Sequence, residues 1–176
     1  MKAPRWLLRT RNAFLPDAEP IYELITSYCD QGVLLPRSLP EICENVRDFV
    51  VVEQRGEIIG CGALHLYGPH LAEIRSIAVR PSWQGRGAGR LLIEALLDQS
   101  EKHQVTGVCL FTRIPQFFSH MGFSVSAREA LPDKLYKDCC SCPKLLCCDE
   151  VAMVRGDLPE LPPEPRPFSM LVKLEA

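Results

Sequence analysis

The stretch from residue 79 to residue 97, VRPSWQGRGAGRLLIEALL, places three glycines between an apolar run and an apolar helix face. Gly85, Gly87 and Gly89 carry no side chain, and they fall where the first turn of a helix leaves its N–H groups without partners. The helix dipole adds partial positive charge at the same place. Because a phosphate can approach bare amides directly, the stretch predicts an anion-binding turn at the start of a helix.

Two familiar nucleotide-binding motifs do not fit these glycines. A dinucleotide-binding GxGxxG motif would need a third glycine, but Gly87-Ala-Gly89 is followed by Arg-Leu-Leu. A P-loop would need Gly-Lys-Ser or Gly-Lys-Thr, which the stretch lacks. On the glycines alone, a turn with no ligand stays open as the alternative.

The composition predicts one ordinary globular domain. The chain has 176 residues, of which 47% are hydrophobic and 24% charged, and its formal net charge is −2. This charge gives no overall attraction to nucleic acid or to an anionic membrane, so we expect neither as a partner. No apolar run approaches the roughly 20 residues that span a bilayer, and the N-terminus lacks the apolar core of a signal peptide. We therefore expect a cytoplasmic protein.

Hydrophobic periodicity predicts helices and strands in an order that gives a mixed sheet of the α/β or α+β class. Asp17 and a capping box at 38–41 predict helix starts, and Arg55-Gly56 predicts a tight hairpin. Strand 73–79, the helix after it and strand 108–112 should form a parallel β-α-β crossover. The expected helices cover 17–28, 39–47, 86–103 and 116–121, and the expected strands cover 49–53, 58–67, 73–79, 108–112, the residues after 123, and 150–154.

The end of the chain differs in composition. Five prolines fall within residues 159–167, which predicts an extended segment rather than core. We divide the chain into a domain over 1–156 and a proline-rich tail over 157–176, in which 169–174 can add a last edge strand.

The glycine turn and a downstream aromatic segment together resemble the GNAT superfamily of N-acetyltransferases. QGRGAG at 84–89 matches that superfamily's Q/R-x-x-G-x-G/A pyrophosphate loop, and FFSHMGF at 117–123 resembles its aromatic-x-x-x-Gly-Phe segment. The resemblance covers about residues 5–155. It implies a mixed, mostly antiparallel sheet with one central parallel β-α-β crossover, flanked by helices, and it implies acetyl-CoA as cosubstrate.

Within the superfamily, four segments resemble the short, kinase-less N-acetylglutamate synthases, which are amino-acid N-acetyltransferases. The segments are 34–38, 60–65, 72–79 and 131–139. Those enzymes acetylate the α-amino group of glutamate and open arginine biosynthesis. The resemblance therefore implies a small-molecule amino acid, glutamate or glutamine, as the acceptor.

The cofactor contacts of the superfamily carry over to matching positions. The strand backbone at 77–79 would pair with the pantetheine arm, and the glycine turn would hold the diphosphate. Phe118 stands where the superfamily often has a tyrosine that serves as general acid, and this departure removes the phenol. The implied cofactor-binding set is Ile77, Ala78, Val79, Gln84, Gly85, Arg86, Gly87, Ala88, Gly89, Arg90 and Phe118.

Acetyl transfer to an amine also needs a base and a proton for the leaving thiolate. Glu73 stands where the matching synthases carry a glutamate that acts on the amine, directly or through water, although a surface strand residue is the alternative interpretation. Thr112 stands where related synthases place a hydroxyl and is the candidate general acid. Tyr136 is a rival for that role, and protonation by solvent is the third route. No cysteine stands in a nucleophile motif beside a histidine, so we expect direct attack in a ternary complex.

Glutamate carries two carboxylates, which favours cations with fork geometry in its pocket. Arg37 matches an arginine in the family's Leu-x-x-Arg-Ser segment and is the expected carboxylate clamp. Arg75 lies two residues after Glu73 and so on the same face of the strand, where it would bind the second carboxylate or pair with Glu73. Lys144 is a further candidate for substrate binding, as is Lys137.

Nine cysteines include five crowded into residues 139–148. An odd total is awkward for a disulfide framework, and the other four lie in apolar segments. A C-x-x-C pair followed by another cysteine leaves three interpretations open: a zinc or iron–sulfur site, a redox-sensitive disulfide, and reduced loop thiols. Because every candidate ligand falls within ten residues and no histidine lies nearby, we expect no metal.

Two rival functions stay open. The same fold could act on another amine, such as a polyamine, an aminoglycoside or a protein N-terminus, although Arg37 and Arg75 disfavour a cationic polyamine. The chain could instead be a non-catalytic acyl-CoA sensor, which the missing phenol at Phe118 keeps open. The sequence allows a homodimer without predicting one.

Overall fold

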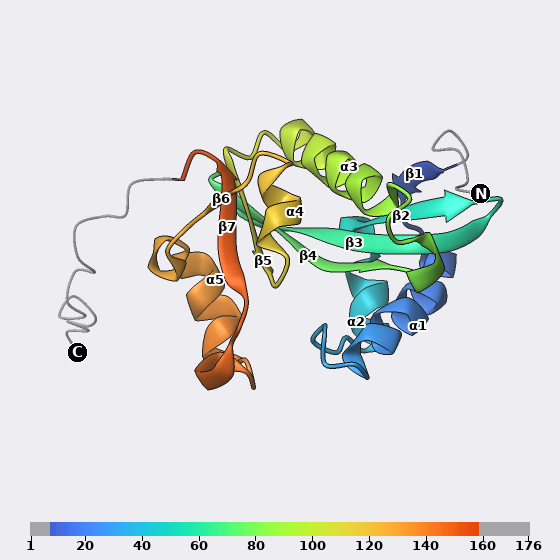
Figure 1. Ribbon diagram of the computed structural model, residues 1–176, viewed down its shortest axis with the longest axis horizontal. Helices are drawn as coiled ribbons and strands as arrows, with labels where there is room; N and C mark the ends of the chain where they lie inside the picture. Colours follow the sequence, from blue (N-terminus) through green and yellow to red (C-terminus); the bar gives the residue numbers. More distant parts are fainter. Residues whose placement is uncertain (1–7, 159–176) are drawn as a thin grey trace, which may run out of the picture.

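Seven strands form one mixed sheet in the order β1-β2-β3-β4-β5-β7-β6 (Figure 1). The computed structural model describes residues 8–158. β4 and β5 run parallel, and every other neighbouring pair in this described part is antiparallel, which confirms the predicted mixed sheet. The strands are β1 Arg9–Asn12, β2 Phe49–Gln54, β3 Glu57–Gly68, β4 Leu71–Val79, β5 Gly107–Thr112, β6 Ser124–Val125 and β7 Val151–Gly156.

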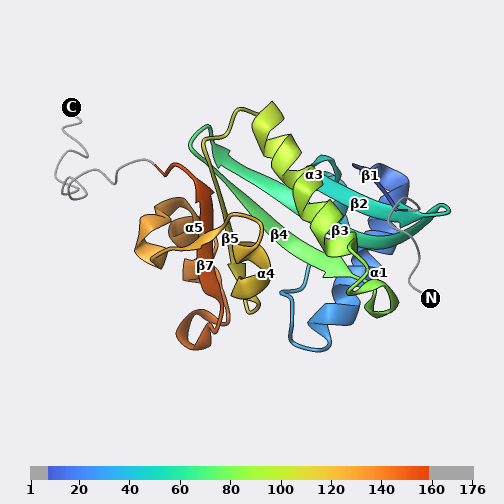
Figure 2. The same cartoon turned by 45° about the horizontal axis from the view of Figure 1, so that its top comes forward.

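Helices cover both faces of this sheet. Figure 2 shows α3 lying across one face, and Figure 1 shows α1, α2 and α5 on the other side. The helices are α1 Ala18–Cys29, α2 Leu39–Glu44, α3 Ala88–Lys102, α4 Pro115–Ser119 and α5 Pro132–Lys137. Short 3-10 turns lie at Leu15–Asp17, Val46–Asp48, Pro81–Trp83, Arg128–Ala130, Cys139–Ser141 and Leu145–Cys147.

The sheet divides the hydrophobic core into separate clusters. Leu92 and Leu96 of α3 are completely buried in the cluster that also takes in α4. Ile21 and Ile25 of α1 are completely buried in the cluster that α1 and α2 form with the opposite face. Leu131, just before α5, is completely buried in a smaller cluster against β5 and β7. Each such side chain contributes about 1.5–3 kcal/mol by leaving water, so the clusters fix the helices on the sheet.

The parallel pairing of β4 with β5 is short. In the described chain Ala72 lies opposite Val108 and Glu73 opposite Cys109, and no further β4–β5 pair follows, although both strands continue. β4 also carries a bulge, because the register with β3 shifts between Cys61 and Ala63 on the partner strand. We call the region between the unpaired ends, residues 74–77 of β4 and 110–112 of β5, the β4–β5 wedge.

The bulge places one residue in a costly backbone conformation. Ser76 has φ +55°, in the left-handed region that a residue with a Cβ rarely adopts. Strain of this kind costs on the order of 1–3 kcal/mol and is found most often at functional sites. Ser76 also lines the cavity that lies in the wedge.

Several local predictions are confirmed. Arg55 and Gly56 form a two-residue hairpin turn with φ +51° and +82°, because Gln54 pairs with Glu57 directly across it. Ser38 caps α2, since its Oγ accepts a hydrogen bond from the Glu41 N–H at 3.3 Å, but the Glu41 carboxylate pairs with Arg37, so only this half of the predicted capping box is confirmed. α3 begins one residue after Gly87, as the glycine turn predicts.

Other features differ from prediction. Asp17 directly precedes α1, but the prediction that its side chain caps the helix is wrong, because the carboxylate is held by Arg11 at 2.6 and 2.9 Å and by the Phe14 N–H. β1 and α5 were not expected, since four polar residues at a sheet edge and a six-residue helix carry no clear period. The predicted tail strand at 169–174 lies outside the described residues.

Candidate active site

A cavity of about 270 Å³ lies in the β4–β5 wedge. This volume is close to the lower end of the range for small-molecule sites, roughly 300–1,000 Å³. β4, β5, the segment before α2, α4 and α5 all contribute to its wall. Six residues singled out in the sequence line it: Arg37, Glu73, Arg75, Ile77, Thr112 and Phe118.

Glu73 sits at the point where β4 and β5 part. Only 3% of its side chain is exposed, and a bare carboxylate at that depth would pay a large desolvation cost. Its Oε1 is instead compensated by Lys134, whose Nζ lies 2.7 Å away, and its Oε2 lies 2.9 Å from the Tyr67 hydroxyl. The surface-residue interpretation of Glu73 is therefore wrong.

Lys134, Tyr67 and Asp138 complete a network around Glu73. Asp138 Oδ2 accepts from the Tyr67 hydroxyl at 2.7 Å and from Lys134 Nζ at 3.0 Å. Burial lowers the pKa of Lys134, but the opposing attraction of Glu73 and Asp138 is larger and raises it overall. Burial, with the two neighbouring carboxylates, raises the pKa of Tyr67. The network thus holds a protonated lysine and a neutral phenol at neutral pH.

Arg75 presents its guanidinium to the cavity from the bulged part of β4. Its Nη1 lies 3.9 Å from Glu73 Oε2 and 3.8 Å from Asp138 Oδ2, distances too long for hydrogen bonds. Within residues 8–158 its side chain makes no hydrogen bond, although only 16% of that side chain is exposed. Its donors are therefore available to an anion in the cavity.

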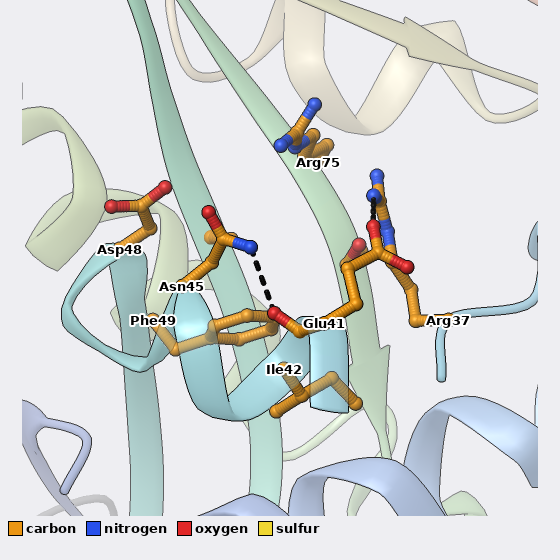
Figure 3. A pocket seen from close by; sticks show the side chains of 9 residues that line it. Arg37, Glu41, Ile42, Asn45, Asp48, Phe49 and Arg75 are labelled. Carbon is orange, nitrogen blue, oxygen red and sulfur yellow. Dashed lines mark hydrogen bonds and ion pairs between the residues drawn. The ribbon is translucent and has the colours of Figure 1, made fainter. Parts of the chain in front are cut away.

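Arg37 approaches the same region from the segment before α2, and it forms an ion pair with Glu41 (Figure 3). Both arginines also line a second cavity of about 10 Å³, against α2, with room for about one water molecule. Figure 3 shows Arg37 beside Glu41, with Arg75 on the neighbouring strand. The structure therefore brings together the two predicted carboxylate-binding arginines.

Thr112 ends β5 at the opposite wall. Its side chain is 7% exposed, and its Oγ1 accepts a hydrogen bond from the Ile114 N–H at 3.0 Å. Phe118 is 3% exposed and packs edge-on against Phe117 and Phe123, so its ring serves the core as well as the cavity wall. Tyr136, the rival acid, is 77% exposed and does not line the cavity.

The glycine turn lies between the end of β4 and α3. Gly85 and Gly87 have φ +68° and +90°, which explains why glycine is needed there. The first hydrogen bond into the helix runs from the Leu91 N–H to the Gly87 carbonyl. The N–H groups of the residues between them have no partner inside the helix and are free for an anion.

Neighbouring side chains brace this turn. The Tyr28 hydroxyl donates to the Val79 carbonyl, and Gln84 Nε2 lies 2.7 Å from the same hydroxyl. Ala88 is 1% exposed and packs into the core cluster with Leu92 of α3. Arg86 stacks on Trp83 at 5.3 Å. Of the other predicted cofactor residues, Ala78 is buried against α1 and α2, and Arg90 pairs with Glu94 at 2.7 Å. A Cβ atom added at Gly89 would lie 3.7 Å from the Phe117 ring.

Lys144 and Lys137 lie elsewhere. Lys144 Nζ donates to the Gly32 carbonyl at 2.8 Å, and Lys137 Nζ lies 5.3 Å from the centre of the Tyr67 ring. Neither lines the cavity.

The sequence analysis missed Lys134 and Asp138, which are one helical turn apart on α5 and just after it. The i,i+4 spacing of a lysine and an aspartate was the available signal.

The cysteine-rich loop holds no disulfide. All nine cysteines, which lie within the described residues, are free thiols. Burial raises the pKa of Cys139. Within residues 8–158 no group of three or more His, Cys, Asp or Glu side chains is arranged to hold a metal ion. No helix in that part is long and apolar enough to cross a membrane.

Comparison with known proteins places this geometry in a family. A family model described as an acetyltransferase (GNAT) domain matches residues 45–125. A protein of Chlorobaculum tepidum, named as an uncharacterized N-acetyltransferase, is 41% identical over 145 residues, which cover 82% of this chain and 94% of that protein. An amino-acid acetyltransferase of Mycobacterium tuberculosis is 31% identical over 133 residues, covering 74% of this chain and 76% of that protein.

Two solved structures share the fold. Rv2747 of Mycobacterium tuberculosis, in complex with CoA and NLQ, has a TM-score of 0.72 at 27% identity, over 85% of this chain and 99% of that chain. N-acetylglutamate synthase of Neisseria gonorrhoeae, complexed with coenzyme A and N-acetyl-glutamate, has a TM-score of 0.76 at 26% identity. The match covers 85% of this chain but 35% of that longer chain. The chain belongs to the GNAT family and is an acetyl-CoA-dependent N-acetyltransferase related to the amino-acid acetyltransferases.

Proposed function

We propose that the enzyme transfers the acetyl group of acetyl-CoA to the α-amino group of glutamate, or of glutamine, in arginine biosynthesis. The observation that carries this proposal is Arg75, a nearly buried guanidinium that faces the wedge cavity with no hydrogen-bond partner in the described chain. A buried cation with unused donors is costly unless an anion completes it. An amino-acid carboxylate supplies that anion in bidentate geometry.

Arg37 bears on the choice between the two acceptors. Its charge is already offset by Glu41, so Arg75 is left as the cavity arginine that makes no hydrogen bond to a carboxylate in the described chain. If Arg37 keeps that partner, as Arg113 keeps Asp149 and Lys134 keeps Glu73, Arg75 is the cation left for a ligand carboxylate and the cavity suits glutamine. If Arg37 turns to the ligand, the second carboxylate of glutamate is bound as well. We therefore keep both amino acids as candidate acceptors.

The proposed mechanism follows from where the groups lie. The amides of residues 85–90 hold the diphosphate, and the pantetheine arm runs along residues 77–79 so that the thioester reaches the wedge. Glu73 takes a proton from the α-ammonium group, and the amine attacks the thioester carbon. A backbone N–H at the β4 bulge stabilises the oxyanion. As the thiolate leaves, the nitrogen loses its second proton and the sulfur takes up one, supplied by Thr112, which recovers a proton from the nitrogen, or exchanged through solvent.

The test is a steady-state screen of the twenty amino acids as acceptors. Release of free CoA thiol is measured with each amino acid at saturating acetyl-CoA, and the acetylated product is identified by mass spectrometry. The proposal predicts that glutamate or glutamine gives a kcat/KM well above that of every other amino acid. Turnover of none of them, despite tight CoA binding, would favour the acyl-CoA sensor instead. Preference for a polyamine or a peptide N-terminus would favour another amine.

A further inference from the structure

Tyr67 joins two carboxylates that come from different elements. Its hydroxyl oxygen lies 2.9 Å from Glu73 Oε2 on β4 and 2.7 Å from Asp138 Oδ2 just after α5. A hydroxyl has one proton to donate, and an ionised carboxylate can only accept. The Tyr67 proton can therefore lie in only one of the two contacts at a time. The other contact is a hydrogen bond only when the carboxyl group on that side is itself protonated. The shorter contact favours Asp138, which leaves a lone pair of Tyr67 facing Glu73.

Acetylation of an amine creates a need for such a contact. An α-ammonium group carries three protons on nitrogen and the amide product carries one, so two protons leave the nitrogen in each turnover. The leaving thiolate consumes one of them. The other must leave the site, and Glu73, which is 3% exposed, reaches solvent through a cavity that the two substrates fill.

We propose that Tyr67 and Asp138 form the proton exit for Glu73, a step that rests on the proposed role of Glu73 as the base. The Glu73 O–H bond breaks as a new O–H bond forms on the Tyr67 oxygen. The original Tyr67 O–H bond breaks as an O–H bond forms on Asp138 Oδ2. Asp138, whose side chain is 35% exposed, then releases the proton to water, and Tyr67 rotates its hydroxyl back. Only a proton moves, and no electrons are gained or lost.

The surroundings of the three groups support this direction. Lys134 lies 2.7 Å from Glu73 and 3.0 Å from Asp138, so the negative charge stays beside the same ammonium group wherever the proton is. Burial raises the pKa of Asp138, but the hydrogen bonds from Tyr67 and Lys134 outweigh it and lower the pKa below its usual range. Asp138 is thus ionised at rest, and a proton that reaches it is readily released to water.

Other titratable groups border the network without interrupting it. Within the described chain the Tyr67 hydroxyl has hydrogen bonds only with the two carboxylates. On the β3 side these groups are His65, whose ring is 4.9 Å from that of Tyr67, and Lys137, which lies over the same ring. Arg75 lies near both carboxylates, the buried thiol of Cys109 is opposite Glu73, and the Cys139 thiol lies near Asp138 and Lys134.

The test is the pH dependence of kcat for Tyr67→Phe, which removes the hydroxyl and keeps the ring. Below the pKa of the acceptor amine, we expect kcat to fall on the order of 10- to 100-fold, with an unchanged KM for acetyl-CoA. Above that pKa the acceptor amine binds in its neutral form, so one proton fewer must leave the site in each turnover. The kcat of Tyr67→Phe should then return toward the wild-type value. Asp138→Asn should follow the same pattern. Tyr22→Phe, on α1 and outside the cavity wall, is the control that should follow the wild type.

Two kinetic outcomes would overturn the proton exit. One is a Tyr67→Phe profile like that of the wild type, and the other is a loss by the same factor at every pH, which a packing defect would give. A substrate-free measurement separates this proposal from the acceptor assignment. By carbon-13 NMR, protonation of either carboxylate should shift the signals of both Glu73 and Asp138 in the wild type, and this linked shift should be smaller in Tyr67→Phe, where Lys134 still contacts both groups. Independent titration in the wild type would refute the exit, whereas a wild type that acetylates no amino acid would refute the acceptor assignment.

Discussion

Replacing Arg75 by alanine removes the one cavity guanidinium that has no hydrogen-bond partner in the described chain. Charge-assisted hydrogen bonds to a carboxylate contribute about 1.5–3 kcal/mol in total at such a site. Since about 1.4 kcal/mol corresponds to a factor of ten, the KM for the amino acid should rise about 10- to 150-fold. The KM for acetyl-CoA should change little, because the glycine turn that would hold the diphosphate lies beyond the far end of β4.

The assay is steady-state thiol release with each substrate varied in turn, at saturating levels of the other. Arg75→Lys keeps the charge but loses the fork, so its amino-acid KM should fall between those of the wild type and Arg75→Ala. Arg47→Ala is the matched control, because Arg47 is an exposed arginine between α2 and β2 that lines neither cavity. The long distances from Arg75 to Glu73 and Asp138 imply little loss of folding stability. If Arg75→Ala raised both KM values equally, or neither, Arg75 would not bind the acceptor.

Substitutions at four further residues test other contacts. Arg37→Ala should raise the amino-acid KM far more than that for acetyl-CoA, and Glu41→Gln, which frees Arg37, should lower the amino-acid KM. Thr112→Val should lower kcat and leave both KM values unchanged, with Thr112→Ser restoring kcat, if the hydroxyl protonates the thiolate. Arg11 hydrogen-bonds to Asp17 and lowers its pKa against the opposing effect of burial. Asp17→Asn should therefore destabilise the fold at neutral pH, by about 1.5–3 kcal/mol, and urea denaturation should show this difference vanish as the pH falls through the lowered pKa of Asp17.

The sequence predicts the parts of the site that depend on local signals. The glycine turn is recognisable because residues 85 and 87 need positive φ at the start of an apolar helix. Glu73 and Arg75 are recognisable as a pair because strand alternation places them on one face. The parallel crossover follows from a strand, a helix and a strand in that order. These features need no knowledge of distant contacts.

The partners of Glu73 could not be found in this way. Tyr67 is on the preceding strand, and Lys134 and Asp138 come more than sixty residues after Glu73, on and just after a six-residue helix with no clear hydrophobic period. The packing of Leu131 against β5 and β7, a contact distant in sequence from Glu73, helps to bring α5 over the wedge. The failed Asp17 cap has a similar cause, since the competing partner, Arg11, is on an edge strand that the periodicity does not reveal.

Calorimetric titration of CoA into Gly87→Asp tests most directly the claim that bare amides at the start of α3 hold the cofactor. The substitution places a side chain and a negative charge where a phosphate is expected. Gly56→Asp is the control, because Gly56 also has positive φ, in the exposed hairpin turn with no atom near its Cβ position. We predict that the Kd for CoA rises at least about 100-fold in Gly87→Asp, the loss of two charged hydrogen bonds, and stays unchanged in Gly56→Asp. Wild-type affinity in a folded Gly87→Asp protein would contradict the placement of the cofactor and the mechanism built on it.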